Sequence, residues 1–246
     1  MSSSLSVYLL DVAVTRALVG SRDDELLDVI RTRFADDLAR DDDYFSHAIE
    51  QGAPTAYEAL RAVVHGGPFS DDSHHAFQYG YAYKRLCELT GSFLANDCFT
   101  PHRGGWLETV DQGLKDLRIT SVSVDAFGYG APPAPVPYAD TPGCGEWTPE
   151  RIARALEEFE ATKRAEHAPP LEPEVVEAVM QCLEWMRHAE ARGGGGGGGV
   201  RGGGARGPGR AGAPPPRPPH APPPPPGGRP RDGEARTTTA RRRSTS

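Results

Sequence analysis

The part of the sequence richest in side chains that could do chemistry is a short tyrosine-rich segment. Tyr79, Tyr81 and Tyr83 stand at alternate positions, and Lys84 and Arg85 follow directly. Tyrosine hydroxyls donate and accept hydrogen bonds, and the two cations could bind an anionic ligand. On a helix, Tyr79 and Tyr83 would share one face, while Tyr81 and Arg85 would share another. One face would pack in the core and the other could line a pocket, although core packing alone accounts for such an aromatic cluster.

A second candidate is the glycine-rich turn Pro101-His102-Arg103-Gly104-Gly105. It stands directly before an expected helix, where free backbone N–H groups could hold an anion. With the tyrosine-rich segment, it defines a predicted pocket for an anionic small molecule, lined by Tyr79, Tyr81, Tyr83, Lys84, Arg85, His102 and Arg103. Glycines before a helix are also ordinary loop residues, and residues 1–190 contain no glycine-rich phosphate-binding motif.

The spacing of metal-ligand residue types does not indicate a metal site. Cys98 and His102 form one pair at a spacing that zinc sites use, but a second pair is missing. The run Asp41-Asp42-Asp43 lacks the glycine and the distal glutamate of a calcium loop. We therefore expect no metal and no cofactor. We also expect free thiols, because no Cys-x-x-Cys pair occurs among the four cysteines, which are Cys87, Cys98, Cys144 and Cys182.

Charge divides the chain into two parts. Residues 1–190 carry 16 Lys and Arg against 32 Asp and Glu, a net charge of −16, whereas residues 191–246 carry 11 Arg against two acidic residues, a net charge of +9. An acidic body repels nucleic-acid backbones and anionic membranes, and it attracts basic proteins. We therefore expect a basic protein partner and no membrane partner, with only the tail suggesting nucleic acid.

The N-terminal segment does not resemble a secretory signal, because no Lys or Arg precedes its apolar run, which stops at Asp11. No later segment approaches the roughly 18 apolar residues of a membrane span. We expect a cytoplasmic protein.

Residues 191–246 hold 16 Gly and 12 Pro, and no Leu, Ile, Phe, Tyr, Trp or Met. Such a segment cannot bury enough apolar surface to offset its ordering entropy, so we predict a globular domain at residues 1–190 followed by a disordered tail. The tail could be an arginine-glycine arm or a polyproline ligand. A frameshift in a G-rich tract explains it equally well, because every residue type in it has GC-rich codons. Such a slip could have removed a native final strand.

Local patterns predict a helix-dominated α+β domain with a small sheet. Residues 6–12 form a short segment rich in apolar side chains, which is typical of a buried strand, and residues 119–124 alternate apolar and polar side chains. Helices are indicated by capping boxes, apolar stripes at helical spacing and a proline at a first helical position. The six expected helices lie at residues 21–38, 55–65, 76–90, 106–117, 149–159 and 173–188. Gly80, inside the third of these, suggests a close approach by a backbone or a ligand.

Four segments carry a resemblance to a family. They read Val7-Tyr-Leu-Leu-Asp-Val12, Thr55-Ala-Tyr-Glu-Ala-Leu60, Phe77-Gln-Tyr-Gly-Tyr-Ala-Tyr-Lys-Arg-Leu86 and Gly104-Gly-Trp-Leu-Glu108. They resemble an uncharacterised domain-of-unknown-function family from high-GC actinobacteria over roughly residues 5–190. The resemblance implies a bacterial cytosolic protein and a tail that is foreign to the family. It implies no activity, cofactor or catalytic residue.

Two functions follow as hypotheses. The first is a non-enzymatic binding or regulatory protein, similar to an immunity protein, whose acidic surface engages a basic protein partner. The second is an enzyme or ligand-binding domain that holds an anionic small molecule in the Tyr/Lys/Arg/His pocket. Whether the protein is an enzyme stays open at this point.

Overall fold

The computed structural model describes residues 2–193 and 198–206. All of them belong to one of two units of the chain, Met1–Ala211, and the second unit, Gly212–Ser246, lies outside the described residues. The elements, in chain order, are β1 (Ser2–Asp11), α1 (Val12–Ala17), α2 (Asp24–Arg33), α3 (Ala35–Tyr44), α4 (Ser46–Glu50), α5 (Ala56–His65), the 3-10 helix η1 (Ser73–His75), α6 (Ala76–Thr90), β2 (Ser92–Phe93), the 3-10 helix η2 (Asp97–Phe99), β3 (His102–Arg103), α7 (Trp106–Asp116), α8 (Ala126–Tyr129), β4 (Gly143–Trp147), α9 (Pro149–Arg164), α10 (Pro173–Gly193) and β5 (Gly198–Arg206).

The described strands form one antiparallel sheet in the order β2-β1-β5-β4, and β3 also pairs with β1. β5 pairs with β1 from Ser3 opposite Arg206 to Asp11 opposite Gly198. On its other side, β5 pairs with all of β4. β1 and β4 are therefore joined through β5.

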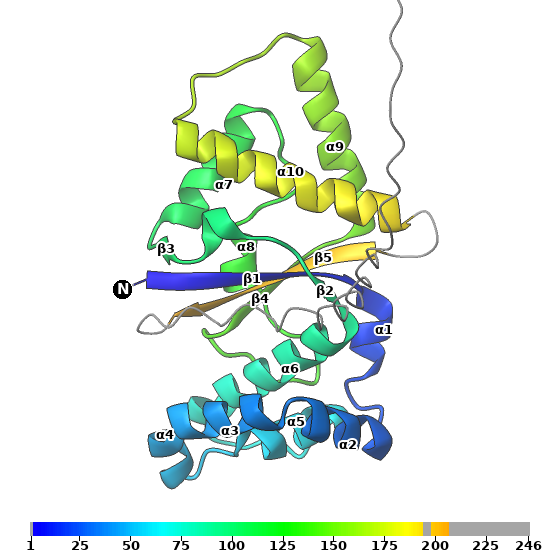
Figure 1. The fold of residues 1–246 in the computed structure, drawn as a ribbon, viewed down its shortest axis with the longest axis vertical. Helices are drawn as coiled ribbons and strands as arrows, with labels where there is room; N and C mark the ends of the chain where they lie inside the picture. The colour runs from blue at the N-terminus through cyan, green and yellow to red at the C-terminus, as the bar shows by residue number, and fades with distance from the viewer. Residues whose placement is uncertain (1, 194–197, 207–246) are drawn as a thin grey trace, which may run out of the picture. The chain divides into compact units, whose positions relative to one another are not determined.

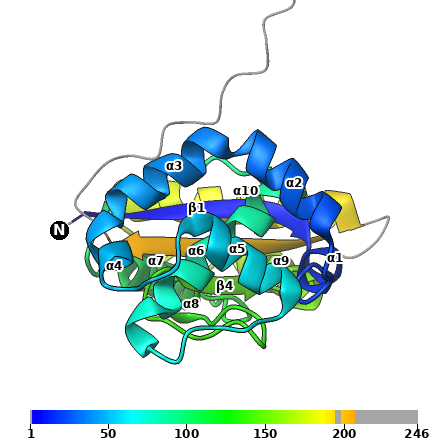
Figure 2. The same ribbon diagram turned by 90° about the horizontal axis from the view of Figure 1, so that it is seen from below.

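Helices cover both faces of the sheet (Figure 1). Alternate residues of β1 point to opposite faces, as in any strand. Leu5, Val7 and Leu9 join the core under α7, α9 and α10, while Tyr8 and Leu10 join a second core with α2, α5 and α6. Figure 2 shows this second helical layer in front of the sheet. The helix-dominated α+β class predicted from the sequence is confirmed.

Several helices begin and end where local sequence signals place them. At the start of α5, the backbone N–H of Thr55 donates to the Glu58 carboxylate over 2.9 Å, and the Thr55 side chain accepts from the Glu58 backbone. Gly66 ends the helix in the left-handed conformation at φ 75°. α9 has Pro149 in its first turn, after Thr148 as N-cap.

The single helix expected over residues 21–38 is two helices, α2 and α3. Phe34 joins them with a φ of −113°, outside the helical range. The first of the two begins later than residue 21, because Asp23 is its N-cap and its side chain accepts from the backbone of Leu26. The apolar stripe survives the bend, since Ile30 and Leu38 are both buried.

The strand predicted at residues 119–124 is wrong. The backbone N–H groups of Thr120 and Ser121 donate to the carboxylate of Glu158 on α9, over 2.8 and 3.1 Å. A side chain therefore supplies the acceptors that a neighbouring strand would supply. The alternating pattern reflected burial of the apolar residues, not strand pairing.

β4 contains two glycines, Gly143 and Gly145. Its glycines are required by α8, whose backbone runs directly against the strand. A Cβ at Gly143 would overlap the carbonyl oxygen of Gly128, and one at Gly145 would overlap that of Ala126. Glycine at these two positions permits close contact between the two backbones, because it has no side chain.

Two described elements extend beyond the domain boundary expected at residue 190. α10 continues to Gly193, and β5 occupies residues 198–206, of which five are glycine. The composition of this segment limits the burial of side chains. Strand pairing uses backbone groups, which a glycine-rich segment possesses in full. The rest of the predicted tail, residues 207–246, lies outside the described residues.

Candidate functional site

The tyrosines of α6 mostly serve the core. Tyr79 and Tyr83 are 3% and 0% exposed, and the Tyr79 hydroxyl accepts a 2.7 Å hydrogen bond from the backbone of Ser70. Tyr81 is half-buried, with its ring 5.2 Å from that of Phe45. Burial, followed by nearby negative groups, raises the pKa of Tyr81 to about 12. The core interpretation of the shared Tyr79 and Tyr83 face is confirmed.

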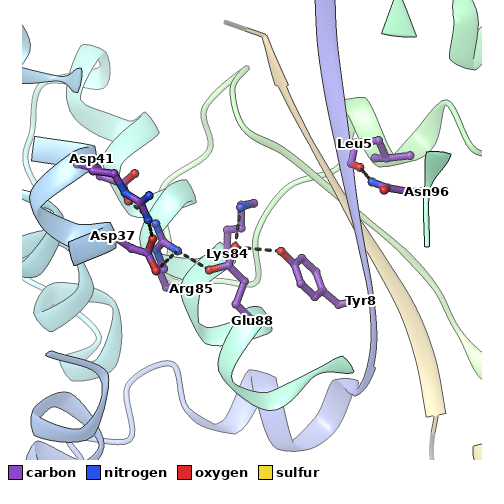
Figure 3. Close-up of polar contacts among 9 residues, drawn as sticks. Leu5, Tyr8, Asp37, Asp41, Lys84, Arg85, Glu88 and Asn96 are labelled. Atoms are coloured by element: carbon purple, nitrogen blue, oxygen red, sulfur yellow. Dashed lines mark hydrogen bonds and ion pairs between the residues drawn. The ribbon is translucent and has the colours of Figure 1, made fainter. Parts of the chain in front are cut away.

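Lys84 and Arg85 are bound to carboxylates (Figure 3). Both contact Glu88 at 2.7 Å, and Arg85 also contacts Asp41 at 2.8 Å. The Tyr8 hydroxyl donates to Glu88 over 2.9 Å. Burial alone would raise the pKa of Glu88, but Lys84 and Arg85 outweigh it and the pKa is lowered. This network ties α6 to α3 and β1, and it occupies the two cations expected to bind an anion.

His102 and Arg103 lie on a different element from the five predicted site residues of α6. They form β3, where His102 pairs with Ser3 of β1. In Figure 1, β3 lies on the side of the sheet covered by α7, and α6 lies on the other side. The structure therefore divides the seven predicted site residues into two groups, five on α6 and two on β3, and does not gather them in one pocket.

His102 opens onto a small hollow of about 90 Å³ between β3, α7 and α8. Its lining residues are Ser3, His102, Gly104, Gly105, Leu107, Glu108, Asp125, Gly128, Tyr129 and Asp140. Three of these are carboxylates, and none of the described lining residues is Lys or Arg. We call this feature the acidic hollow. The lining of this hollow is negatively charged, whereas the sequence predicted an anion-binding pocket at the His102 turn.

The imidazole of His102 is held at Nδ1 by the neighbouring backbone. Its Nδ1 lies 3.0 Å from the backbone oxygen of Arg103. A carbonyl oxygen only accepts, so Nδ1 carries the hydrogen of this contact. Nε2 is buried and has no hydrogen-bond partner in the part of the chain that the structure describes.

The carboxylates of the acidic hollow repel one another. Burial raises the pKa of Asp125, and the charges of Glu108 and Asp111 raise it further against the opposing effect of Lys115. The Tyr129 hydroxyl lies 3.5 Å from Glu108, with the residue 54% exposed at the rim. A bound cation would relieve this repulsion, because it favours the ionised form of each carboxylate.

An anion is disfavoured in the same place. Gly104 and Gly105 do bring the N-terminus of α7 to the acidic hollow, and Gly105 has a φ of +79°. Glu108, however, already places a negative charge in the first turn of α7, where it interacts favourably with the helix dipole. An incoming anion would meet Glu108, Asp125 and Asp140 together.

Sequence reasoning identified His102 but missed Glu108, Asp125, Tyr129 and Asp140. These residues come from α7, the segment before α8, the end of α8 and the loop before β4. No local spacing connects them, so the sequence held no signal for their convergence. Among residues 2–193 and 198–206, no group of three or more His, Cys, Asp or Glu is arranged to hold a metal ion.

In the same described ranges, no helix is both long and apolar enough to cross a membrane. Comparison with known proteins finds no matching curated protein and no matching solved structure. A family model, described as a domain of unknown function (DUF7691), matches residues 1–200. The match covers most of the 246-residue chain, including nearly every element described above. The chain therefore belongs to the DUF7691 family.

Proposed function

We propose that the protein is a non-enzymatic binding or regulatory protein that engages a basic protein partner, with the acidic hollow as the centre of the contact. The observation that carries this proposal is the lining of the hollow, which has three carboxylates and, among the described lining residues, no Lys or Arg. We also propose that it acts in the cytosol of a high-GC actinobacterium, as the sequence resemblance suggests.

The size of the acidic hollow favours a side chain over a free metabolite. Its volume is about 90 Å³, close to that of three water molecules at roughly 30 Å³ each. Pockets for small-molecule ligands typically enclose about 300 to 1,000 Å³. The charged end of one side chain on a larger partner fits a space of this size. The rest of the partner would then cover the surrounding rim.

Long-range charge supports the same partner. Residues 1–190 carry a net charge of −16, which attracts basic proteins from a distance and repels acidic ones. This electrostatic attraction alone is not specific, because it acts on any cationic surface. The acidic hollow supplies a defined point at which one basic group can be desolvated and bound.

The alternative function, an enzyme or ligand-binding domain with an anion pocket around α6, stays a prediction. It would require Lys84 and Arg85 to exchange their carboxylate partners for the ligand. It would also have to do without His102 and Arg103, which lie on β3. The basic-partner proposal requires no such rearrangement.

A matched pair of charge variants tests the proposed function. The first, Glu108→Gln/Asp125→Asn/Asp140→Asn, neutralises the acidic hollow. The second, Asp36→Asn/Asp43→Asn/Glu157→Gln, removes three exposed acids on α3 and α9. Both variants lose the same charge, so non-specific attraction changes equally.

The probe is a fluorescein-labelled peptide of repeated Gly-Ser-Arg, followed by anisotropy at low and physiological salt. We expect the hollow variant to bind at least about tenfold more weakly than wild type, and the control variant to change by about twofold or less. Equal losses in the two variants, or no binding by wild type at low salt, would overturn the proposal. A repeated Gly-Ser-Glu peptide should not bind.

A further inference from the structure

The connection between α5 and α6 brings together a serine, a histidine and an aspartate. The Oγ atom of Ser70 lies 3.0 Å from Nδ1 of His75, and Nε2 of the same ring lies 3.8 Å from Oδ2 of Asp72. A hydroxyl beside an imidazole that faces a carboxylate is the arrangement by which enzymes activate a serine nucleophile. None of the three residues lines the acidic hollow, and the proposed function does not use them.

We propose that Ser70 is a site of covalent acylation, at which an activated carboxylic ester transfers its acyl group to the hydroxyl oxygen. A bond forms between Oγ of Ser70 and the acyl carbon, and the bond from that carbon to the leaving group breaks. The hydroxyl proton passes to Nδ1 of His75 and then to the leaving group. The inference goes beyond the proposed function and does not depend on the acidic hollow.

Asp72 favours the tautomer of His75 that this step needs. A carboxylate only accepts hydrogen bonds, so it favours a hydrogen on Nε2 and leaves the lone pair of the neutral ring on Nδ1, beside Ser70. The 3.8 Å separation is longer than a hydrogen bond, as such contacts often are before a substrate binds. In serine proteases the serine faces Nε2 instead. Proton transfer needs one nitrogen that accepts and one that donates, so either order serves.

A backbone donor also faces the nucleophile. The N–H group of Asp72 donates to Oγ of Ser70 over 3.2 Å. A donor in this position stabilises the negative charge that develops on the oxygen as its proton leaves. Because the donor uses a lone pair of the oxygen, the hydroxyl hydrogen remains available to Nδ1 of His75.

α6 fixes the positions of both reacting side chains. His75 directly precedes the helix, and the hydroxyl of Tyr79, one turn further along, accepts a 2.7 Å hydrogen bond from the backbone N–H of Ser70. The side chain of His75 is 13% exposed, and a Cβ at Gly52 would lie 3.8 Å from its Cε1. The ring is therefore packed against protein, while Ser70 is half-buried beside the exposed residues 71–74.

Helix capping alone does not account for these contacts. Asp72 is the N-cap of η1, and its Oδ1 accepts from the backbone N–H of His74 over 2.8 Å. The cap uses one carboxylate oxygen, whereas the other faces the ring of His75. Capping also does not require the contact between His75 and the hydroxyl of Ser70.

The sequence of this segment provides matched controls. Residues 70–75 read Ser-Asp-Asp-Ser-His-His, so each residue type occurs twice, once in the cluster and once beside it. The three residues beside the cluster are exposed. They are Asp71, Ser73 and His74. Each can be replaced in the same way as its counterpart in the cluster.

Acetylation by p-nitrophenyl acetate tests the nucleophile. The full-length protein reacts at about pH 8, where imidazole groups are predominantly neutral. Tandem mass spectrometry follows the acetyl group on each serine, and absorbance follows the released p-nitrophenolate. We expect Ser70 to be acetylated at least about tenfold faster than Ser73. Ser70→Ala should abolish the fast release of p-nitrophenolate, and Ser73→Ala should leave it unchanged.

The paired histidines test the base. His75→Gln can still hydrogen-bond to Ser70 but cannot take its proton, so acetylation of Ser70 should slow by about hundredfold. His74→Gln should change the rate by about twofold or less, because its side chain is exposed and outside the cluster. Melting temperatures report whether each variant is folded.

The paired aspartates test the positioning role of Asp72. Asp72→Asn keeps an oxygen that can cap η1 but loses the charge that orients the ring of His75. We expect acetylation of Ser70 to slow by at least about tenfold, with a melting temperature within about 2 °C of wild type. A role in capping alone would leave the rate unchanged, because asparagine caps as well as aspartate. Equal rates in Asp72→Asn and Asp71→Asn would contradict the positioning role.

The outcomes separate this inference from the proposed function. If Ser70 is acetylated no faster than Ser73 in wild type, or if His75→Gln and His74→Gln react alike, the proposal is wrong. Release of many equivalents of p-nitrophenolate per chain, lost in Ser70→Ala, would support Ser70 as a nucleophile and would overturn the non-enzymatic part of the proposed function. A reactive Ser70 in a protein that does not bind the Gly-Ser-Arg peptide would support this inference alone.

Discussion

Gly80, in the middle of α6, lies directly against the ring of Pro142 in the segment that leads into β4. A Cβ at residue 80 would lie 2.9 Å from Cδ of the proline. The close approach that the sequence suggested at Gly80 is therefore made by a proline side chain, and it fixes how near α6 can lie to the sheet.

Replacing Gly80 by alanine should destabilise the protein. Alanine gains about 1 kcal/mol of helix propensity over glycine, but overpacking against a rigid ring typically costs about 1 to 3 kcal/mol. We expect a net loss of about 1 kcal/mol in the free energy of unfolding, measured with urea. Gly104→Ala is the control, because a Cβ there has no neighbour within 4 Å among the described residues. A Gly80→Ala variant more stable than wild type would contradict the contact.

Replacing Glu88 by glutamine should destabilise the protein in a pH-dependent way. The mostly buried carboxylate holds Lys84, Arg85 and Tyr8, and removing one partner of a buried ion pair costs about 3 kcal/mol or more. The folded state lowers the pKa of Glu88, so its contribution is present above the unfolded-state pKa and lost as the pH falls through the folded-state pKa.

Urea unfolding of wild type and Glu88→Gln across a pH series checks this prediction. The difference in unfolding free energy should be largest at neutral pH and should shrink in acid. Tyr8→Phe removes the hydrogen bond to Glu88 and leaves its charge in place, so it should cost about 1 kcal/mol. A difference that stays constant with pH would mean that the charge of Glu88 does not stabilise the fold.

Replacing Asp125 by asparagine should stabilise the protein while weakening its proposed binding. The folded state raises the pKa of Asp125, through burial and then through Glu108 and Asp111. Wild type therefore loses stability as the pH rises through that folded-state pKa, and Asp125→Asn does not. We expect a melting temperature about 1 to 3 °C above wild type at neutral pH, and no difference in acid. A lower melting temperature at neutral pH would contradict the repulsion.

Two truncations should distinguish the contribution of β5 to stability from that of the residues that follow it. Ending the chain after Gly193 removes β5 and leaves β1 and β4 without the strand that joins them. We expect that form to aggregate or to lose cooperative unfolding, because exposed strand edges pair with other chains. Ending the chain after Arg206 should shift the melting temperature by about 2 °C or less. Thermal unfolding and size-exclusion chromatography distinguish these outcomes. A stable, monomeric protein that ends at Gly193 would show that β5 is dispensable.

The sequence by itself determined the features that depend on local hydrogen bonds. The capping box of Thr55 and Glu58, the left-handed stop at Gly66 and the proline start of α9 are confirmed because their partners lie within a few residues. α6 also has the predicted bounds. Helices close their hydrogen bonds along one stretch of chain, so their signals can be read in one window.

Tertiary structure decided the features whose partners are distant in the chain. Residues 119–124 looked like a strand but bind Glu158, while β5 looked like part of a disordered tail but pairs with β1 and β4. The candidate site followed the same rule. The network around Glu88 occupied the cations of α6, and the acidic hollow gathered Glu108 and Asp125 around His102 from separate segments. A strand or a hollow exists only through partners that folding brings together, and no local pattern records them.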